Sequence, residues 1–338
     1  MAKTYTITVK ENSQMLPGHE YLDVEDIAIA VSSYGIYYMV FAYLRQQHNI
    51  AEILQQLSTF KNFGKPPGFD DLNRKLNLFA KVLTICEFAT IVAYKIMRIV
   101  KKSECKTTLA ELGLTRYYCG LGTPVWSWFD LDYFPVFHLF VLYGFLFALI
   151  HSKNCSQISY HVLEISYHAT LRIDHLKSLI ESCFDSNNPK TSYKRFEKCV
   201  AYHNEILNLM EKIDTTFKSV MFGHFALTGA VCACLEKQII DGHNAFTGFC
   251  HFMSWITAIF VVCVAGQRVI NASESVSDAL WTSKWYEADI VLQKCLLVML
   301  TRSQKSCTLK AGPFGILSYR FFISVLKTSY SILCVLSS

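Results

Sequence analysis

Six stretches of this chain are apolar and long enough to cross a lipid bilayer, and this restricts its fold more than any other feature. A spanning helix needs about 20 mostly apolar residues. The stretches cover residues 27–44, 76–100, 133–150, 219–235, 244–267 and 311–338. The stretch at 76–100 is the weakest of them, because it contains four charged residues. The sequence therefore predicts an all-α fold, a polytopic transmembrane helical bundle with six visible spans.

Charge and motif content exclude several other classes of protein. Only 17% of the residues are charged, against roughly a quarter in average soluble proteins. The net charge of +5 is modest and its basic residues are spread through loops, so nucleic acid is not an expected partner. The cysteines show no zinc-like CxxC pair, and neither a Gly-x-Ser-x-Gly motif nor a phosphate-binding loop occurs. We therefore expect no catalytic residue, no metal ion and no cofactor.

The long polar connection at 152–218 is predicted to be mostly helical. Apolar residues from His161 to Ile180 recur at spacings of three and four, which indicates an amphipathic helix. The turn-forming segment Asp185–Pro189 is expected to end this helix. A second helix from Phe196 to Phe217 is predicted to run into the next span.

Basic residues in the connections predict the orientation in the membrane. The connections at 45–75, 152–218 and 268–310 hold five, nine and six Lys or Arg residues. On the other side, the amino-terminal tail, 101–130 and 236–243 hold two, four and one. Cytoplasmic loops carry an excess of Lys and Arg, so the first group is predicted to be cytoplasmic and the amino terminus of this chain to be outside.

An ordered series of short motifs gives the chain a resemblance to a known family. The carboxyl-terminal part contains Trp281-Thr-Ser-Lys-Trp-Tyr286, Leu309-Lys-Ala-Gly-Pro-Phe314 and Leu317-Ser-Tyr-Arg-Phe-Phe322 in this order. Pro124-Val-Trp126, Ala169–Leu176 and Tyr202–Leu207 precede them. Each motif alone is weak, but their shared order resembles the insect odorant receptors, from about residue 22 to the end.

The resemblance implies a function and an assembly. Family members resemble one another in forming odorant-gated non-selective cation channels, in which four subunits surround a central pore. It implies that this chain is an odour-tuning subunit in a heterotetramer with an odorant coreceptor subunit, binding a small volatile odorant and membrane lipid. The implied location is the plasma membrane, as a multi-pass protein of olfactory sensory neuron dendrites. The family has seven spans, and here the span corresponding to the first is missing.

The division of the chain that follows from the spans and the resemblance has six parts. They are an amino-terminal tail (1–25), the first three visible spans and ligand-side bundle (26–151), a cytoplasmic helical segment (152–218), the next two spans (219–270), a cytoplasmic anchor segment (271–312) and a pore-lining last span (313–338). Alternatives that stay open are a truncated, non-functional receptor remnant and a G-protein-coupled-type chemoreceptor.

The resemblance places the odorant in a small apolar cavity in the outer half of each subunit. Aromatic walls give shape-selective contacts to volatile, mostly apolar molecules. The candidate ligand-binding residues of this chain are Tyr34, Thr90, Tyr94, Phe134, Phe137, His138, Phe252 and Trp255. Ordinary core packing is the competing interpretation for each of them, and Glu87 is given no role.

The last span presents two faces that could line a pore. Helical spacing puts Arg320, Ser324, Lys327 and Ser331 on one face, which could be wetted or could contact neighbouring helices. The resemblance instead places an apolar constriction at Leu333, on the opposite face, and a basic pore would repel cations. The candidate pore residues are therefore Phe322, Leu326, Ser329, Leu333 and Leu336. A hydrophobic constriction of this kind can gate by dewetting.

Overall fold

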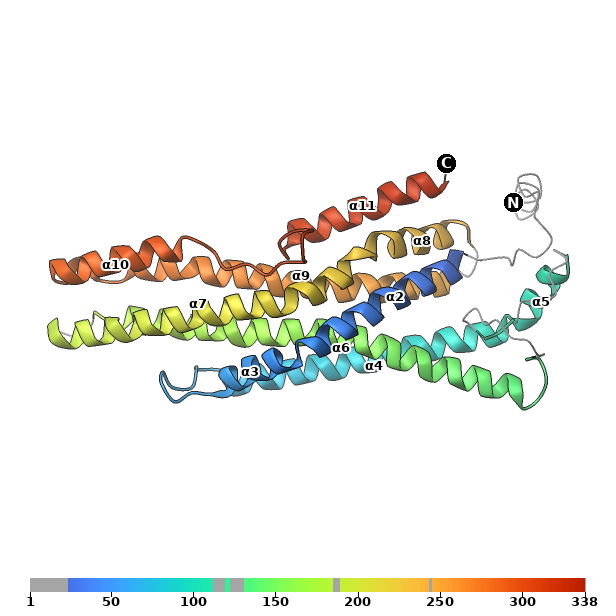
Figure 1. Cartoon of the computed structure of the whole chain (residues 1–338), viewed down its shortest axis with the longest axis horizontal. Coiled ribbons are helices and arrows are strands. Elements are labelled where there is room, and N and C mark those ends of the chain that lie inside the picture. The colour runs from blue at the N-terminus through green and yellow to red at the C-terminus, as the bar shows by residue number, and fades with distance from the viewer. Residues whose placement is uncertain (1–23, 112–118, 122–130, 185–188, 243–244, 338) are drawn as a thin grey trace.

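The structure, a computed structural model, describes residues 24–111, 119–121, 131–184, 189–242 and 245–337. Within these ranges the chain is built of helices (Figure 1). They are α2 (Val24–Arg45), α3 (Gln47–Ser58), α4 (Phe69–Val100), α5 (Lys102–Glu111), α6 (Val136–Glu181), α7 (Pro189–Ala226), α8 (Thr228–Ile240), α9 (Ala245–Thr282), the 3₁₀ turn η1 (Trp285–Glu287), α10 (Ile290–Ser303) and α11 (Tyr319–Ser337). Nearly all of the predicted tail, the Pro124–Trp126 motif and residues 185–188 lie outside the described residues.

Six helical stretches of the described chain are long and apolar enough to cross a membrane. They are Ile27–Arg45, Phe69–Val100, Val136–Glu181, Lys190–Ile240, Ala245–Thr282 and Tyr319–Ser337. Each contains or overlaps one of the six spans expected from the sequence. The all-α transmembrane bundle predicted from the sequence is confirmed.

Several of these helices are much longer than the bilayer is thick. The predicted boundaries between segments of the chain therefore fall inside single helices. With 46 residues, α6 is about 69 Å long, more than twice the ~30 Å hydrocarbon core. The span at 133–150 and the amphipathic stretch from His161, which were assigned to different parts of the chain, form one continuous helix. The polar residues between them include no Pro or Gly, so nothing interrupts the backbone. In the same way, α7 and α9 run across the predicted boundaries at 218 and 270.

A break between α7 and α8 divides the fourth predicted span, 219–235, which was expected to be continuous. Leu227 separates the two helices. Thr228 follows it, and its hydroxyl donates to the carbonyl of His224 at 2.5 Å. A Thr side chain that bonds back to the preceding turn bends a helix. This break redirects α8 toward α11, which packs against it.

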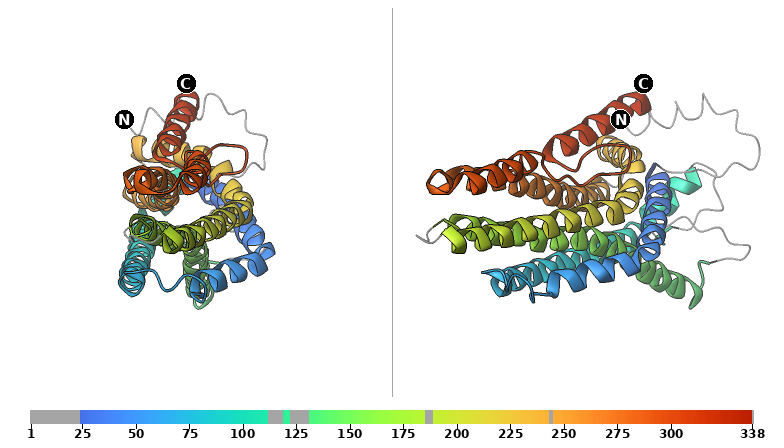
Figure 2. Two further views of the ribbon diagram at one scale, coloured as in Figure 1. Left: turned by 90° about the vertical axis from the view of Figure 1, so that its left-hand side faces the viewer. Right: turned by 60° about the vertical axis from the view of Figure 1, so that its left-hand side comes forward.

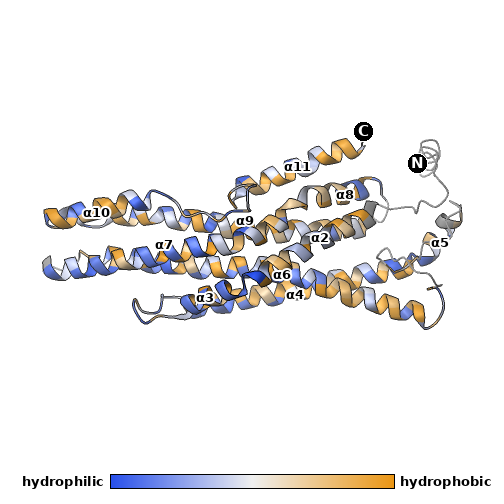
Figure 3. Cartoon of the chain, in the orientation of Figure 1, coloured by the Kyte–Doolittle hydropathy of each residue, from blue (hydrophilic) through white to orange (hydrophobic). Residues whose placement is uncertain are grey.

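Burial differs sharply between the two ends of the bundle. At the end formed by the long extensions, α6, α7 and α9 bury a continuous core that includes Ile165, Ile173, Tyr202, Ile206 and Val276. At the other end the apolar side chains are mostly exposed: only 6% of the apolar window of α4 and 11% of that of α6 is buried. Hydrophobic residues gather on that half of α4 and α6 (Figure 3). Exposed apolar surface on this scale fits contact with lipid or neighbouring subunits.

The last helix lies at the edge of the bundle. Figure 2 shows α11 along one side, with its carboxyl end pointing away from the long extensions. It contacts α8 and α9. The segment before it is tied back at Leu317, whose N–H donates to the Leu309 carbonyl at 2.8 Å and whose side chain is fully buried. Leu317 lies directly against Gly266 of α9, where an added Cβ would stand 2.3 Å from the Leu317 oxygen.

Candidate functional site

A cavity of about 180 Å³ lies between four helices in the half of the bundle with exposed apolar surface. An engineered apolar cavity of about 150 Å³ holds benzene, so this space suits a ligand of similar or slightly larger size. Its lining includes Ser32 and Ile36 from α2, Glu87, Thr90, Tyr94 and Lys95 from α4, Phe147 and His151 from α6, and His251 and Trp255 from α9. Most of this lining surface is apolar, as in other small-molecule sites.

One wall of the cavity is fixed by the break between α7 and α8. The indole Nε1 of Trp255 donates to the Thr228 hydroxyl at 3.2 Å. The ring of His224 stands edge-on to the Trp255 ring, with 5.9 Å between the centroids. Trp255 itself is only 5% exposed. Because its polar atom is satisfied on the side away from the cavity, the indole can present a rigid apolar face to a ligand.

Polar side chains mark both ends of the α4 wall. The Ser152 hydroxyl of α6 donates to Glu87 at 3.3 Å. Two turns further along α4, the buried ammonium of Lys95 donates to the backbone carbonyl of Leu121 at 3.2 Å. Leu121 belongs to the connection between α5 and α6, so Lys95 links the cavity wall to this connection.

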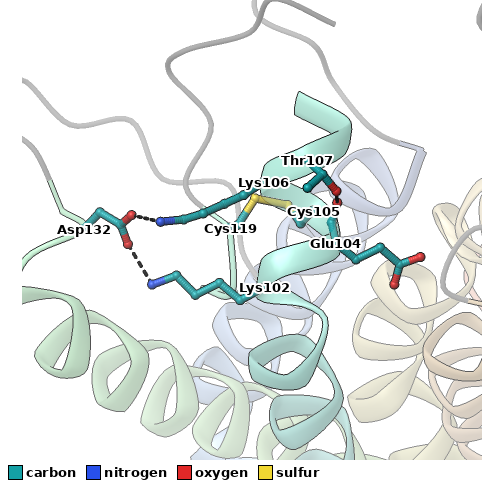
Figure 4. The surroundings of a disulfide bond; sticks show 7 residues. All are labelled: Lys102, Glu104, Cys105, Lys106, Thr107, Cys119 and Asp132. Atoms are coloured by element: carbon teal, nitrogen blue, oxygen red, sulfur yellow. Dashed lines mark hydrogen bonds and ion pairs between the residues drawn. A yellow bond between two sulfur atoms is a disulfide. The ribbon is translucent and has the colours of Figure 1, made fainter. Parts of the chain in front are cut away.

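A disulfide and an ion-pair cluster join α5 to Cys119 and Asp132, which lie between α5 and α6 in the chain (Figure 4). Cys105 of α5 is bonded to Cys119. Asp132 accepts hydrogen bonds from Lys102 at 2.7 Å and from Lys106. The bond from Lys102 and then that from Lys106 hold the pKa of Asp132 below its ordinary value. Disulfides persist in oxidising compartments, which agrees with the outside location that the basic residues predict for 101–130.

The cavity brings together three of the eight candidate ligand residues. Thr90, Tyr94 and Trp255 line it. Tyr34 and Phe134 point outward, with 74% and 80% of their surface exposed.

The other candidates have partners outside the cavity. Phe137 lies under Lys102, whose ammonium is 3.3 Å from the ring centroid, and His138 packs edge-on against Phe134. Phe252 is partly buried against the hydrophobic core. Phe137 and His138 stand in the first turn of α6, about 20 Å along the axis from His151, so they lie too near the start of α6 to reach the cavity.

Sequence reasoning missed several polar lining residues. Ser32, Lys95, His151 and His251 were not candidates, and Glu87 had no role assigned. The available signal was their position inside or next to apolar spans, where polar groups are rare and face the bundle interior. Among the described residues, no group of three His, Cys, Asp or Glu side chains is arranged to hold a metal ion.

The candidate pore face of α11 is turned largely toward its own chain. Ser329 is fully buried and donates to Glu236 of α8 at 2.9 Å, and Leu333 is 7% exposed. Phe322 packs edge-on against Phe260 of α9, and Leu326 is half-buried.

Only one candidate pore residue is exposed. Leu336 has 45% of its surface free. The exposed face of α11 instead carries Arg320, Ser324, Lys327 and Ser331. Pore lining by Ser329 and Leu333 therefore stays a prediction, and it requires α11 to turn or to separate from α8.

Comparison with known proteins identifies the family. The model of the family described as 7tm Odorant receptor matches residues 24–330. The chain belongs to the odorant receptor family. The resemblance seen in the motifs is confirmed, and this odorant receptor is a multi-pass membrane protein.

Relatives and solved structures agree with this assignment. The chain is 26% identical to odorant receptor 85b of Drosophila melanogaster over 217 residues, 62% of this chain and 54% of that protein. It is 27% identical to odorant receptor 22c of the same species over 147 residues, 43% of this chain and 36% of that protein. The matched part thus spans about half or less of these relatives. The fold is similar to the olfactory receptor OR5 of Machilis hrabei in complex with eugenol, with a TM-score of 0.65 at 14% identity, covering 99% of this chain and 96% of that one.

Proposed function

We propose that this odorant receptor is the odour-tuning subunit of a heteromeric, non-selective cation channel in the plasma membrane of olfactory sensory neurons. Its partner is an odorant coreceptor subunit, and four subunits surround one pore. The observation that carries the proposal is the cavity between α2, α4, α6 and α9. It has the size of a small volatile molecule and lies in the half of the bundle whose apolar surface fits a membrane.

The arrangement of α9, α8 and α11 supports coupling between the cavity and the last helix. Trp255 of α9 touches the cavity on one side and Thr228 of α8 on the other. The same α8 holds α11 through Glu236 and Ser329. A ligand shifts a conformational equilibrium only by its differential affinity for the two states. In this proposal, the odorant favours the position of Trp255 that loosens the packing of α11 on α8.

The exposed surface of α11 supports assembly around an axis. Two of its apolar side chains remain exposed within the described chain, Tyr330 at 65% and Leu336 at 45% of their surface. In this proposal these residues meet the other subunits or the pore, with Leu336 as the constriction residue that is already exposed. Ser329 and Leu333 would reach the pore only on rotation of α11.

Whole-cell current from cells that express this chain with an insect coreceptor tests the proposal. An odour-dependent cation current that is absent with the coreceptor alone is the expected result. Substituting Thr90→Trp fills the cavity and should abolish or shift the odour response. Tyr34→Trp, on the outward face of α2, is the matched control and should leave the response unchanged. Surface-expressed receptor that passes no current with any odour, or a response that needs a second messenger, would refute the channel assignment.

A further inference from the structure

We propose that Lys95 makes the cavity selective for small carboxylic acids, by supplying the counter-charge for the carboxylate of the ligand. This inference rests on the proposed function, because it names the chemical class of odorant that the same cavity takes. Four features of the site support it: the burial of Lys95, the absence of a carboxylate within ion-pair distance of it among the described residues, a second basic residue nearby, and the distance to the acidic group of the cavity.

The first two features concern Lys95 itself. It lines the cavity and is 5% exposed. Its ammonium has three donors, and one of them is used by the Leu121 carbonyl at 3.2 Å. Within the described part of the chain, no carboxylate lies within ion-pair distance of it. A buried charge is normally paired, so an anionic ligand oxygen would complete the surroundings of this ammonium.

A second basic residue, Arg98, lies near this end of the cavity. Arg98 lies one turn beyond Tyr94 on α4. Its Nε donates to the Tyr94 hydroxyl at 3.4 Å, and its guanidinium carbon is 5.7 Å from the centre of the Tyr94 ring. Tyr94 also lines the cavity. Arg98 thus lies beside the part of the cavity wall that Tyr94 and Lys95 form.

The acidic group of the cavity is too far away to neutralise Lys95. Glu87 is eight residues earlier on α4, which is about 12 Å along the helix. It already accepts a hydrogen bond from Ser152. The two lining histidines, His151 and His251, come from α6 and α9. Lys95 and Glu87 thus lie at opposite ends of the α4 wall of the cavity, and the Lys95 ammonium is the group that can donate further hydrogen bonds to a ligand.

Cavity size limits the acid. The volume of about 180 Å³ is slightly larger than a cavity that holds benzene. An acid with a short apolar tail, such as hexanoic acid, would place its tail against Phe147 and Trp255. The tail would then occupy the apolar surface while the carboxylate reaches Lys95.

The test compares three probes of equal chain length at one pH: hexanoic acid, hexan-1-ol and hexylamine. Each is applied to cells that express the receptor with a coreceptor, and to cells with the coreceptor alone. The variants are Lys95→Met, Lys95→Arg and Lys81→Met, a lysine on the exposed side of α4. We expect Lys95→Met to raise the half-maximal concentration of hexanoic acid about tenfold to a hundredfold more than it raises that of hexan-1-ol. Lys95→Arg should keep the preference for the acid, and Lys81→Met should behave as the unmodified chain.

The remaining outcomes separate failure of this inference from failure of the proposed function. If no odour, neutral or charged, gives a current from surface-expressed receptor, the proposed function fails. If neutral odours work but Lys95→Met lowers acid and alcohol responses equally, Lys95 only holds the outer connection, and the inference is overturned. A preference for hexylamine that Glu87→Gln removes would equally overturn it.

Discussion

Gly266 permits the close approach of α9 to the segment that leads into α11, and Gly266→Ala should break it. A Cβ at this position would stand 2.3 Å from the Leu317 oxygen and 2.5 Å from the Leu317 Cβ. The nearest obstacle is backbone, which cannot rotate away. Leu317 is also fully buried and bonded to Leu309. The strain must therefore move the start of α11.

Two opposing terms set the magnitude of this effect. Overpacking of a well-packed site typically destabilises by about 1–3 kcal/mol. Replacing Gly by Ala within a helix recovers about 0.5–1 kcal/mol. The net expectation for Gly266→Ala is a loss of about 0–2.5 kcal/mol in the free energy of unfolding.

A second helical glycine provides the matched control. An added Cβ at Gly35 of α2 would meet its nearest atom at 3.7 Å, an ordinary van der Waals contact. Gly35→Ala should therefore stabilise by about 0.5–1 kcal/mol through helix propensity alone. Thermal unfolding of the two purified variants in one detergent, at one scan rate, measures the difference. Equal stability of the two, or a more stable Gly266→Ala variant, would refute the close packing of α9 on Leu317.

Three further predictions concern α11 and the outer connection. Ser329→Ala removes the hydrogen bond to Glu236 and should weaken the packing of α11 on α8 by about 1–3 kcal/mol. The measurement is the basal current, which should change in this variant. Ser324→Ala, on the exposed face of α11, is the control and should leave the basal current unchanged. The pKa of Asp132 is lowered in the folded protein. Its ion pairs therefore contribute fully to stability above the unfolded carboxyl pKa of about 3.9, and this contribution is lost as the pH falls through the lower folded pKa. The hydrogen-exchange protection of α5, taken relative to the unfolded-chain rate at each pH, should thus be constant from pH 7 to 5, fall only in stronger acid, and lose this acid dependence in Asp132→Asn. Cys119→Ser removes the disulfide that closes a short loop, and should lower the free energy of unfolding by about 3 kcal/mol. Reduction of the unmodified chain should cause the same loss of stability. If reduction leaves the stability unchanged, this prediction is wrong.

The local pattern of residues was enough to predict the class of fold. Runs of about 20 apolar residues must become helices in lipid, because only helices satisfy their own backbone there. The charge-free run at 244–267 became the membrane part of α9, and the periodic stretch from His161 became a buried face of α6. The order of the short motifs near the carboxyl end was enough to predict the family, because the residues themselves carry that resemblance.

Only the tertiary structure decided which side chains share a site. Thr90 and Trp255 meet in the cavity, whereas Phe134 and Phe137, which are aromatic like Trp255 and were also candidates, do not. Helical depth and rotation separate them, and neither is fixed by composition. The turn of Ser329 toward α8 has the same origin. A helix with apolar residues on several faces can bury any one of them, and its packing against neighbouring helices determines which face is buried.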